Sequence, residues 1–359
     1  MSYKNIYILG VGGSGMSSIA KYLKQKGDNV IGYDQRKSYV TNLLNQDGIK
    51  VVHTLDEITY KPESLYIYSS AIPIESDRFE DFHDKENVLS RPEYLKNLSE
   101  NHKIIGITGT HGKTSTTALL SHIFHFNNVN VSYLYGGITT FNGIGGHYGD
   151  PDQPLILETD EAFNTFEKIK ISDLLVLNVD SDHLDYFKNL DNYKDAFYKV
   201  MKNVTDNLVI NNDDLNIKSM KELKNPVSYG KDISADFKVQ SPGTFLYENN
   251  KYEIKSDIIG DHFKSNMLGA IILAFLNGIE IKDSLNAIES FAGVKRRIEL
   301  IGISKGVLIY DDYGHHPTEM EATIAALKQQ TESKLYVVFQ PHRYTRTMEY
   351  FSSFKILLN

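Results

Sequence analysis

The sequence contains no cysteine and no tryptophan, and only 9 of its 359 residues are proline. Without cysteine the chain can have no disulfide bond, no thiolate metal ligand and no cysteine nucleophile, which fits a reducing compartment. The longest mostly apolar run, residues 267–276, is well short of the ~18 residues that a membrane-spanning helix needs. Lys and Arg number 38 against 46 Asp and Glu, a formal net charge of −8, and no basic run stands out. We therefore expect a cytoplasmic protein that is not a general nucleic-acid or membrane binder.

The remaining composition is that of an ordinary globular protein, with 41% hydrophobic and 23% charged residues. At a typical ~150 residues per domain, the length favours two or three domains. The first residues carry no long apolar segment and lead directly into a strand-like run, so no signal peptide is expected.

Short aliphatic runs alternate with helical periodicity along the whole chain, the pattern of α/β domains built on parallel sheets. We predict three domains, at residues 1–100, 101–293 and 294–359. The predicted strands lie at residues 5–9, 30–33 and 65–68 in the first domain, 103–107, 155–157, 174–177 and 208–210 in the second, and 307–310 and 335–339 in the third.

A glycine-rich turn follows the first predicted strand. Gly10, Gly12 and Gly15 have the spacing of a dinucleotide-binding loop, and Asp34 ends the next strand. Such glycines let a diphosphate approach the backbone and the unpaired amides at a helix N-terminus. The motif does not distinguish a nicotinamide dinucleotide from a nucleotide sugar, and a turn that only packs helix against strand remains an alternative.

A second and sharper loop, residues 109–114, reads Gly-Thr-His-Gly-Lys-Thr and follows a predicted buried strand. Its amides would hold phosphates, Lys113 would supply a point charge for their oxygens, and the Thr114 hydroxyl would reach Mg²⁺. The full P-loop pattern would have glycine where this chain has Ile107, so the match is to a shorter variant. We expect Lys113 to face solvent, so that its removal would spare the fold.

Acidic clusters follow two further strands, at residues 158–161 and 180–185. The carboxyl ends of parallel strands share one edge of a sheet, where ligands of open α/β folds bind. Glu158 and its neighbours would supply the oxygen ligands that Mg²⁺ prefers, and His183 could add a neutral imidazole. Each cluster taken alone could equally be a solvated acidic loop.

Arginine and histidine are concentrated in loops of the third domain, at residues 296–297, 311–317 and 340–346. Arginines beside histidines suit the binding of a carboxylate or of a phosphoryl group in transfer. A surface network of ion pairs is the alternative interpretation.

Taken together, these motifs resemble those of the Mur ligases over essentially the whole chain. The resemblance rests on Gly-Val-Gly-Gly-Ser-Gly-Met at 10–16, Ser69-Ser70-Ala71-Ile72, residues 109–114, Glu-Thr-Asp-Glu at 158–161, Asp-His-Leu-Asp at 182–185, Asp-Asp-Tyr-Gly-His-His-Pro-Thr-Glu at 311–319 and Phe-Gln-Pro-His-Arg-Tyr-Thr-Arg-Thr at 339–347. It implies a Rossmann-like N-terminal domain that holds a UDP-sugar, a P-loop-type central ATPase domain, and an incomplete Rossmann-like C-terminal domain that closes over an amino acid.

The implied reaction is the ATP-dependent joining of L-alanine to UDP-N-acetylmuramate through an acyl phosphate, in peptidoglycan precursor synthesis, with Mg²⁺. By the same resemblance, Lys113, His183, His315 and Arg343 would be catalytic. ATP would contact Gly109, Thr110, His111, Gly112, Lys113, Thr114, Asn266, Arg297 and Asp312. The substrates would contact Gly10, Gly12, Gly13, Ser14, Gly15, Asp34, Ser69, Ser70, Tyr313 and Arg346. Thr114, Glu158 and His183 would hold metal.

This chain departs from the family pattern at three places. Ala162 and Phe163 replace Ser-Asp after the acidic motif, Phe263 replaces an asparagine that helps to bind the nucleotide base, and the chain ends roughly 70 to 100 residues early. From the last departure we expect a loosely docked third domain, with Phe339 exposed and amide synthesis weak or absent. The alternatives are a ligase that recycles a peptide onto the same UDP-sugar, a non-catalytic nucleotide-binding relative, and an NAD-dependent dehydrogenase.

Overall fold

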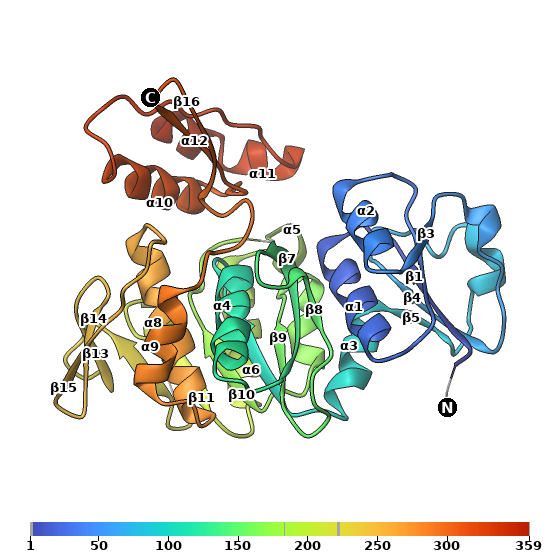
Figure 1. Cartoon of the computed structure of the whole chain (residues 1–359), viewed down its shortest axis with the longest axis horizontal. Helices are drawn as coiled ribbons and strands as arrows, with labels where there is room; N and C mark the ends of the chain where they lie inside the picture. Colours follow the sequence, from blue (N-terminus) through green and yellow to red (C-terminus); the bar gives the residue numbers. More distant parts are fainter. Residues whose placement is uncertain (1–2, 183, 221–222, 359) are drawn as a thin grey trace.

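The computed structural model describes residues 3–182, 184–220 and 223–358, which fold into three units (Figure 1). The first unit is a five-stranded parallel sheet in the order β3-β2-β1-β4-β5. Its elements are β1 Asn5–Leu9, α1 Ser14–Gln25, β2 Val30–Tyr33, α2 Tyr39–Gln46, β3 Lys50–Val52, η1 Leu55–Glu57, β4 Ser64–Tyr68, η2 Asp77–Phe82, β5 Val88–Ser90 and α3 Arg91–Ser99. The strand order reverses at β1, and the glycine-rich turn follows this strand, at the position where doubly wound sheets bind ligands.

The second unit is a ten-stranded mixed sheet in the order β15-β14-β13-β12-β11-β10-β6-β9-β7-β8. Its strands are β6 Ile104–Thr108, β7 Ser132–Thr139, β8 Gly143–His147, β9 Leu155–Glu158, β10 Asp173–Val176, β11 Leu208–Asn211, β12 Val227–Gly230, β13 Phe237–Ser241, β14 Thr244–Tyr247 and β15 Asn250–Glu253. Its helices are α4 Lys113–Phe126, η3 Ala162–Lys168, α5 Leu184–Phe187, α6 Leu190–Lys202, α7 Leu215–Lys218, α8 Asp261–Leu276 and α9 Ile281–Glu289.

The central strands of this sheet are buried on both faces, which explains their nearly continuous apolar sequence. In β6, Ile104 packs into the cluster that contains η3 and α6, whereas its neighbour Ile105 packs into the cluster beneath α4, α8 and α9. This alternation follows from the two-residue period of a strand. The predicted strands of the first two units are all present.

The third unit consists of an antiparallel hairpin and three helices: β16 Glu299–Ser304, β17 Val307–Asp311, α10 Pro317–Lys328, α11 Tyr344–Glu349 and α12 Phe351–Leu357. Apolar hairpin side chains are exposed, for example Ile303 at 67% and Val307 at 60%. The strand predicted at residues 335–339 is wrong: this segment is irregular and pairs with no strand in the described part of the chain. A parallel strand needs backbone partners, and the two-stranded hairpin supplies none to it. Phe339 is half-buried and packs on Phe354 with ring centroids 4.9 Å apart.

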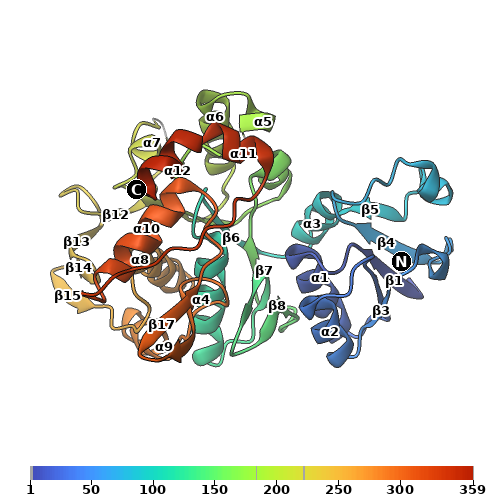
Figure 2. The same ribbon diagram turned by 90° about the horizontal axis from the view of Figure 1, so that it is seen from above.

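The units meet along two seams. Helix α1 of the first unit lies against β7 and β8 of the second, as both ribbon views show (Figures 1 and 2). The linker to the third unit is attached to β7, because Thr139 forms a bridge with Val294 and the Lys295 amide donates to the Ile138 carbonyl at 2.9 Å. Immediately afterwards Arg296 and Ile298 adopt positive φ angles of 61° and 50°.

Candidate active site between the three units

The loop at residues 109–114 connects β6 to α4 and has the backbone geometry of an anion site. Gly109 and Gly112 have φ angles of 144° and 88°. A Cβ on Gly112 would lie 2.4 Å from Nδ2 of Asn266, so glycine is required there. No side chain caps the N-terminus of α4. Its first amides are therefore available to phosphate oxygens.

Lys113 is fixed within this loop. Its Nζ donates to the carbonyls of Gly109 and Thr110 at 2.7 and 3.1 Å, and to Oε1 of Glu161 at 3.0 Å. Burial alone would lower the pKa of Lys113, but the nearby carboxylates of Glu161, Asp160 and Glu158 together outweigh burial and raise that pKa. The side chains of Lys113 and Glu161 are 14% and 1% exposed, so the expectation of a solvent-facing lysine is wrong.

Thr114 and Glu158 come together at the start of α4. The Thr114 hydroxyl donates to Oε1 of Glu158 at 2.7 Å, and the Gly136 amide donates to Oε2 at 2.5 Å. A hydroxyl and a carboxylate at the edge of a phosphate loop are the hard oxygen ligands that suit Mg²⁺. The residues present therefore fit the metal. His183, the third predicted ligand, lies outside the described residues.

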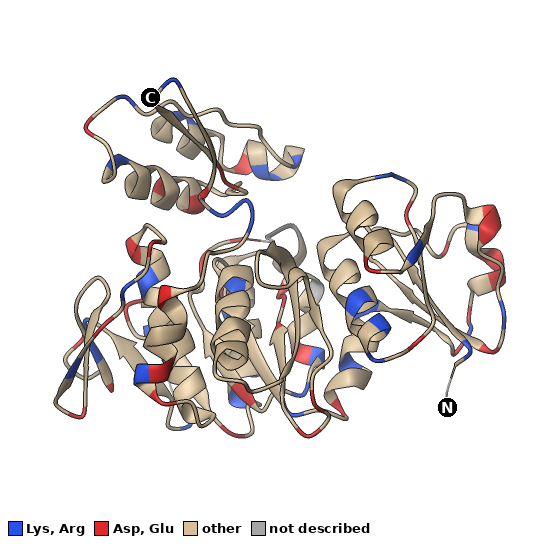
Figure 3. Ribbon diagram, in the orientation of Figure 1, with Lys and Arg blue, Asp and Glu red and all other residues tan. Residues whose placement is uncertain are grey.

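A cavity of about 430 Å³ joins the three units above this loop. The predicted site residues that line it are Ser14, Thr110, His111, Gly112, Lys113, Thr114, Glu158, Arg297, Tyr313, His315, Arg343 and Arg346. The structure therefore brings together the loop at residues 109–114, the predicted metal ligands Thr114 and Glu158, and the predicted amino-acid end. Figure 3 shows acidic and basic residues interspersed on all three units.

Two further predicted ATP contacts line a second cavity of about 420 Å³ between the second and third units, whereas Gly109 lines neither cavity. Asn266 and Asp312 lie there, together with Arg297, beside an apolar wall that includes Phe263. Asp312 is held by two backbone amides, from Ile298 at 2.8 Å and Gly314 at 2.7 Å. His111, Gly112, Arg297 and Glu319 line both cavities, so a single extended ligand could occupy the two.

The glycine-rich turn of the first unit forms a separate surface beside the main cavity. The Gly12 amide donates to Oδ2 of Asp34 at 2.9 Å, and a Cβ on Gly10 would lie 3.0 Å from Cβ of Ser69. The residues of this predicted set that do not line the main cavity are Gly10, Gly12, Gly13, Gly15, Asp34, Ser69 and Ser70. Gly15 lines a smaller cavity of about 90 Å³ that shares Ser14 and Glu158 with the main one.

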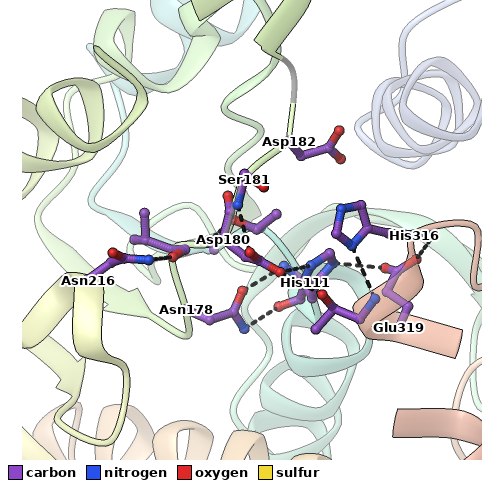
Figure 4. A network of polar contacts seen from close by, with 12 residues as sticks. His111, Asn178, Asp180, Ser181, Asp182, Asn216, His316 and Glu319 are labelled. Atoms are coloured by element: carbon purple, nitrogen blue, oxygen red, sulfur yellow. Dashed lines mark hydrogen bonds and ion pairs between the residues drawn. The ribbon is translucent and has the colours of Figure 1, made fainter. Parts of the chain in front are cut away.

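His111 connects the phosphate loop to the third unit (Figure 4). Asn178 fixes its backbone, accepting from the His111 amide at 2.8 Å and donating to its carbonyl at 2.9 Å. The imidazole contacts Oδ2 of Asp180 through Nε2 and Oε1 of Glu319 through Nδ1, both at 3.3 Å. Thr318 also donates to Asp180, at 2.8 Å.

These contacts set the charge of the network. Burial alone would lower the pKa of His111, but its hydrogen bonds to Asp180 and Glu319 outweigh burial and raise that pKa to about 9. The hydrogen bond from His111 holds the pKa of Asp180 well below its usual range. Burial alone would raise the pKa of Glu319, but the hydrogen bond from His111 and the charges around it lower it instead.

Sequence reasoning did not assign functions to Asn178 and Glu319. Pro317 with glutamate two residues later does signal the start of a helix, and Glu319 accepts from the amides of His315 and His316 at 3.1 and 3.4 Å. The sequence therefore accounts for its capping role. The second carboxylate oxygen of Glu319 reaches His111 only because the third unit docks on the loop at residues 109–114. No local sequence pattern reveals this docking.

Comparison with known proteins gives a consistent result for all three units. Residues 5–103, 107–274 and 296–355 match the models described as Mur ligase family, catalytic domain; Mur ligase middle domain; and Mur ligase, glutamate ligase domain. The UDP-N-acetylmuramate--L-alanine ligase of Clostridium botulinum is 35% identical, over 98% of this chain and 80% of its own length. The protein of the same name from Dictyoglomus turgidum is 34% identical, over 99% and 79%.

Two solved structures are similar in fold. The UDP-N-acetylmuramate-alanine ligase of Thermotoga maritima superimposes with a TM-score of 0.83 at 25% identity, covering 98% of this chain and 88% of that one. A murein peptide ligase from Psychrobacter arcticus gives a TM-score of 0.75 at 23% identity, over 95% and 79%. Among the described residues, no helix is long and apolar enough to cross a membrane.

Proposed function

Because the chain belongs to the Mur ligase family, we propose that it joins L-alanine to UDP-N-acetylmuramate in an ATP-dependent reaction, as its named relatives indicate. The observation that carries this proposal is the cavity of about 430 Å³, where an anion-binding loop, two hard oxygen ligands and basic side chains from the third unit converge. A dehydrogenase would leave this convergence unexplained.

The reaction has two steps, and both balance without a redox partner. The substrate carboxylate attacks the γ-phosphorus of ATP to give an acyl phosphate and ADP. The amine of L-alanine then attacks the acyl carbon, forming the amide and releasing phosphate. Such chemistry depends mainly on positioning and charge neutralisation, which the lining residues can provide.

In this proposal each group of residues has a defined task. The α4 amides and Lys113 bind phosphate oxygens, and the second cavity, with Asn266 and Asp312, holds the rest of the nucleotide. Thr114 and Glu158 would hold Mg²⁺, which supplies charge neutralisation when bound. The Gly10–Gly15 turn binds the UDP-sugar from the first unit. His315 and Arg343 act at the amino-acid end, and His183 would hold a second metal near the acyl phosphate.

The proposal also includes the domain limits 1–100, 101–293 and 294–359, supported by the attachment of the linker at Val294 to β7. A cytoplasmic location is part of it, because ATP and nucleotide-linked sugars are cytoplasmic substrates. At the Ala162 departure, the Ala162 amide donates to Oδ1 of Asp160 at 3.0 Å.

Amino-acid-dependent phosphate release with UDP-N-acetylmuramate and ATP tests this function. We expect release only when all three substrates are present, and a product whose mass equals the sugar nucleotide plus one alanine residue. A panel with glycine, L-serine and a short peptide separates this reaction from peptide ligation. If product forms only with the peptide, the peptide and not L-alanine is the substrate. Nucleotide binding without any product would favour a non-catalytic relative.

A further inference from the structure

Three side chains from two units meet beside the loop at residues 109–114, in an arrangement that the proposed reaction leaves unexplained. His111 belongs to this loop, Asp180 follows β10, and His316 immediately precedes α10 of the third unit (Figure 4). One nitrogen or oxygen atom of each side chain lies within 4.8 Å of those of the other two. Nε2 of His111 and Oδ2 of Asp180 are 3.3 Å apart. Two ligand atoms bound at ~2.0 Å to one tetrahedral metal ion are separated by about the same distance.

The buried imidazole of His316 is the observation that points to a ligand. His316 is 3% exposed, and its Nε2 has no hydrogen-bond partner among the described residues. Leaving a buried polar group unpaired is costly. His316 lines neither of the two large cavities, so a substrate bound in them does not supply the missing partner. Burial lowers the pKa of His316, which favours the neutral imidazole that metal ions bind.

Neighbouring groups already orient the other two side chains. Oδ1 of Asp180 accepts from the Ser181 amide and Oδ2 accepts from the Thr318 hydroxyl, both at 2.8 Å. Nδ1 of His111 lies 3.3 Å from Oε1 of Glu319. Histidine ligands of metal ions usually donate their second ring N–H to a carboxylate in this way. The contact with Glu319 therefore keeps Nε2 of His111 directed at Asp180.

We propose that His111, Asp180 and His316 form a binding site for a divalent transition-metal ion of the zinc class, which ties the third unit to the loop at residues 109–114. Two imidazoles and one carboxylate suit zinc, whereas Mg²⁺ prefers oxygen ligands such as those of Thr114 and Glu158. The site is therefore distinct from the magnesium site of the proposed reaction in its residues and in its chemistry.

Metal binding at this site requires two changes of protonation. The ion takes the place of the proton that Nε2 of His111 shares with Asp180, and this proton is released to solvent. In His316 the ring proton moves from Nε2 to Nδ1, so the hydrogen bond of 3.3 Å from the Thr318 amide to Nδ1 is lost. A metal–nitrogen bond replaces this long hydrogen bond, and the His316 ring stays neutral. The ion gains two carboxylates, Asp180 as a ligand and Glu319 behind His111.

The first test titrates the full chain with zinc against a chromophoric chelator, with Mg²⁺ in excess. It compares the wild type, His316→Asn and the matched control His125→Gln, since His125 is an exposed histidine on α4. Asparagine is a good helix N-cap, so His316→Asn keeps the cap of α10 and loses the imidazole.

Loss of a residue behind a metal ligand weakens binding about 10- to 100-fold, so loss of a ligand should weaken zinc binding by about 100-fold or more. The His125→Gln control should match the wild type. Equal zinc affinity in the wild type and His316→Asn, or no zinc binding to the wild type, would overturn the proposal.

The second test is X-ray absorption at the zinc edge on the wild type loaded with one equivalent of zinc. It needs no substitution, so it holds even if His316→Asn folds poorly. We expect a low-coordinate zinc ion with two imidazole ligands. Fewer than two imidazoles would show that the ion lies elsewhere and would overturn the assignment.

Hydrogen exchange followed by mass spectrometry tests the tie between the units. Zinc should slow amide exchange both in α10 and in residues 109–114 of the wild type, and in neither segment of His316→Asn. Slower exchange in residues 109–114 alone would show that the ion does not reach the third unit, against the proposal. These readouts need no substrate, so their failure leaves the proposed ligase reaction standing, and a failed ligase assay leaves the metal site standing.

Discussion

Lys113 is positioned before any nucleotide arrives. Two carbonyls and the Glu161 carboxylate hold its ammonium group over the phosphate loop. Preorganised charge is effective in catalysis because little reorganisation is needed as the reaction proceeds. The same arrangement makes Lys113 part of a buried ion pair, so the catalytic contribution that we propose for it and its structural contribution have to be separated experimentally.

We expect Lys113→Ala to lower turnover by about 10²- to 10³-fold, the usual cost of losing one charged stabilising group. It should also lower the melting temperature, because it removes the cation from a carboxylate that is 1% exposed. In the double variant Lys113→Ala/Glu161→Gln, part of the thermal stability should return without turnover. Thermal unfolding and phosphate release on the three proteins measure both effects. Near wild-type turnover in either variant would contradict the role of Lys113.

At the scale of single elements, α1 belongs to the first unit and also packs against the second. Its N-terminus follows the glycine-rich turn, while its Ser18 carbonyl lies against β8, where a Cβ on Gly146 would be only 2.0 Å away. From the same helix, Lys21 donates to the Ile144 carbonyl at 3.2 Å and to that of Asn142. The spacing between the glycine-rich turn of the first unit and the loop at residues 109–114 is therefore set by helix-to-strand packing.

Gly146→Val should separate α1 from β8, because neither backbone can give way cheaply to a branched side chain. We expect a lower melting temperature and an increase in KM for UDP-N-acetylmuramate, with nucleotide binding to the second unit retained. Gly302→Ala is the matched control, since a Cβ there meets nothing within 4 Å. Equal KM values in the two glycine variants would show that this contact does not position the first unit.

Most elements could be predicted from the sequence, because β1, β2, β6 and β9 are buried runs bounded by clear turn signals. The segment at 335–339 has the same apolar character but no strand partner, so composition alone misassigned it. The glycine and lysine motif at residues 109–114 correctly predicted a loop between a buried strand and a helix. The contact between His111 and Glu319 and the seating of α1 on β8 could not be predicted, because both depend on how separate units dock.

For the molecule as a whole, one of the contacts that dock the third unit is the one between protonated His111 and Glu319. The hydrogen bonds of His111 to Asp180 of the same unit and to Glu319 of the third unit raise the pKa of His111 to about 9, so the charged contact between His111 and Glu319 is complete below the ordinary value of ~6.5 and is lost as the pH rises through about 9. Asp180 and Glu319 have lowered pKa values, so their contribution is present above the ordinary carboxyl range near ~4 and is lost as the pH falls below it. Docking should therefore be strongest between about pH 5 and 6.5.

Energy transfer between two dyes can follow this docking directly. Because the chain has no cysteine, Lys282→Cys on α9 and Glu332→Cys beyond α10 give two unique labelling sites, both exposed. We expect the efficiency of energy transfer to change with pH, with a midpoint near pH 9. The Glu319→Gln variant should have this midpoint at a lower pH. A flat profile from pH 6 to 10 would show that His111 does not control docking.

The linker to the third unit also contains a strained backbone conformation. Ile298 is β-branched and has a φ of 50°, a left-handed conformation that costs such a residue about 1–3 kcal/mol. One amide hydrogen bond, from Ile298 to Asp312, helps to hold it there. Any rotation of the third unit that returns Ile298 to a negative φ releases this energy. The docked form thus carries a local backbone cost at Ile298, which lowers the net free energy gained from the contacts of the third unit.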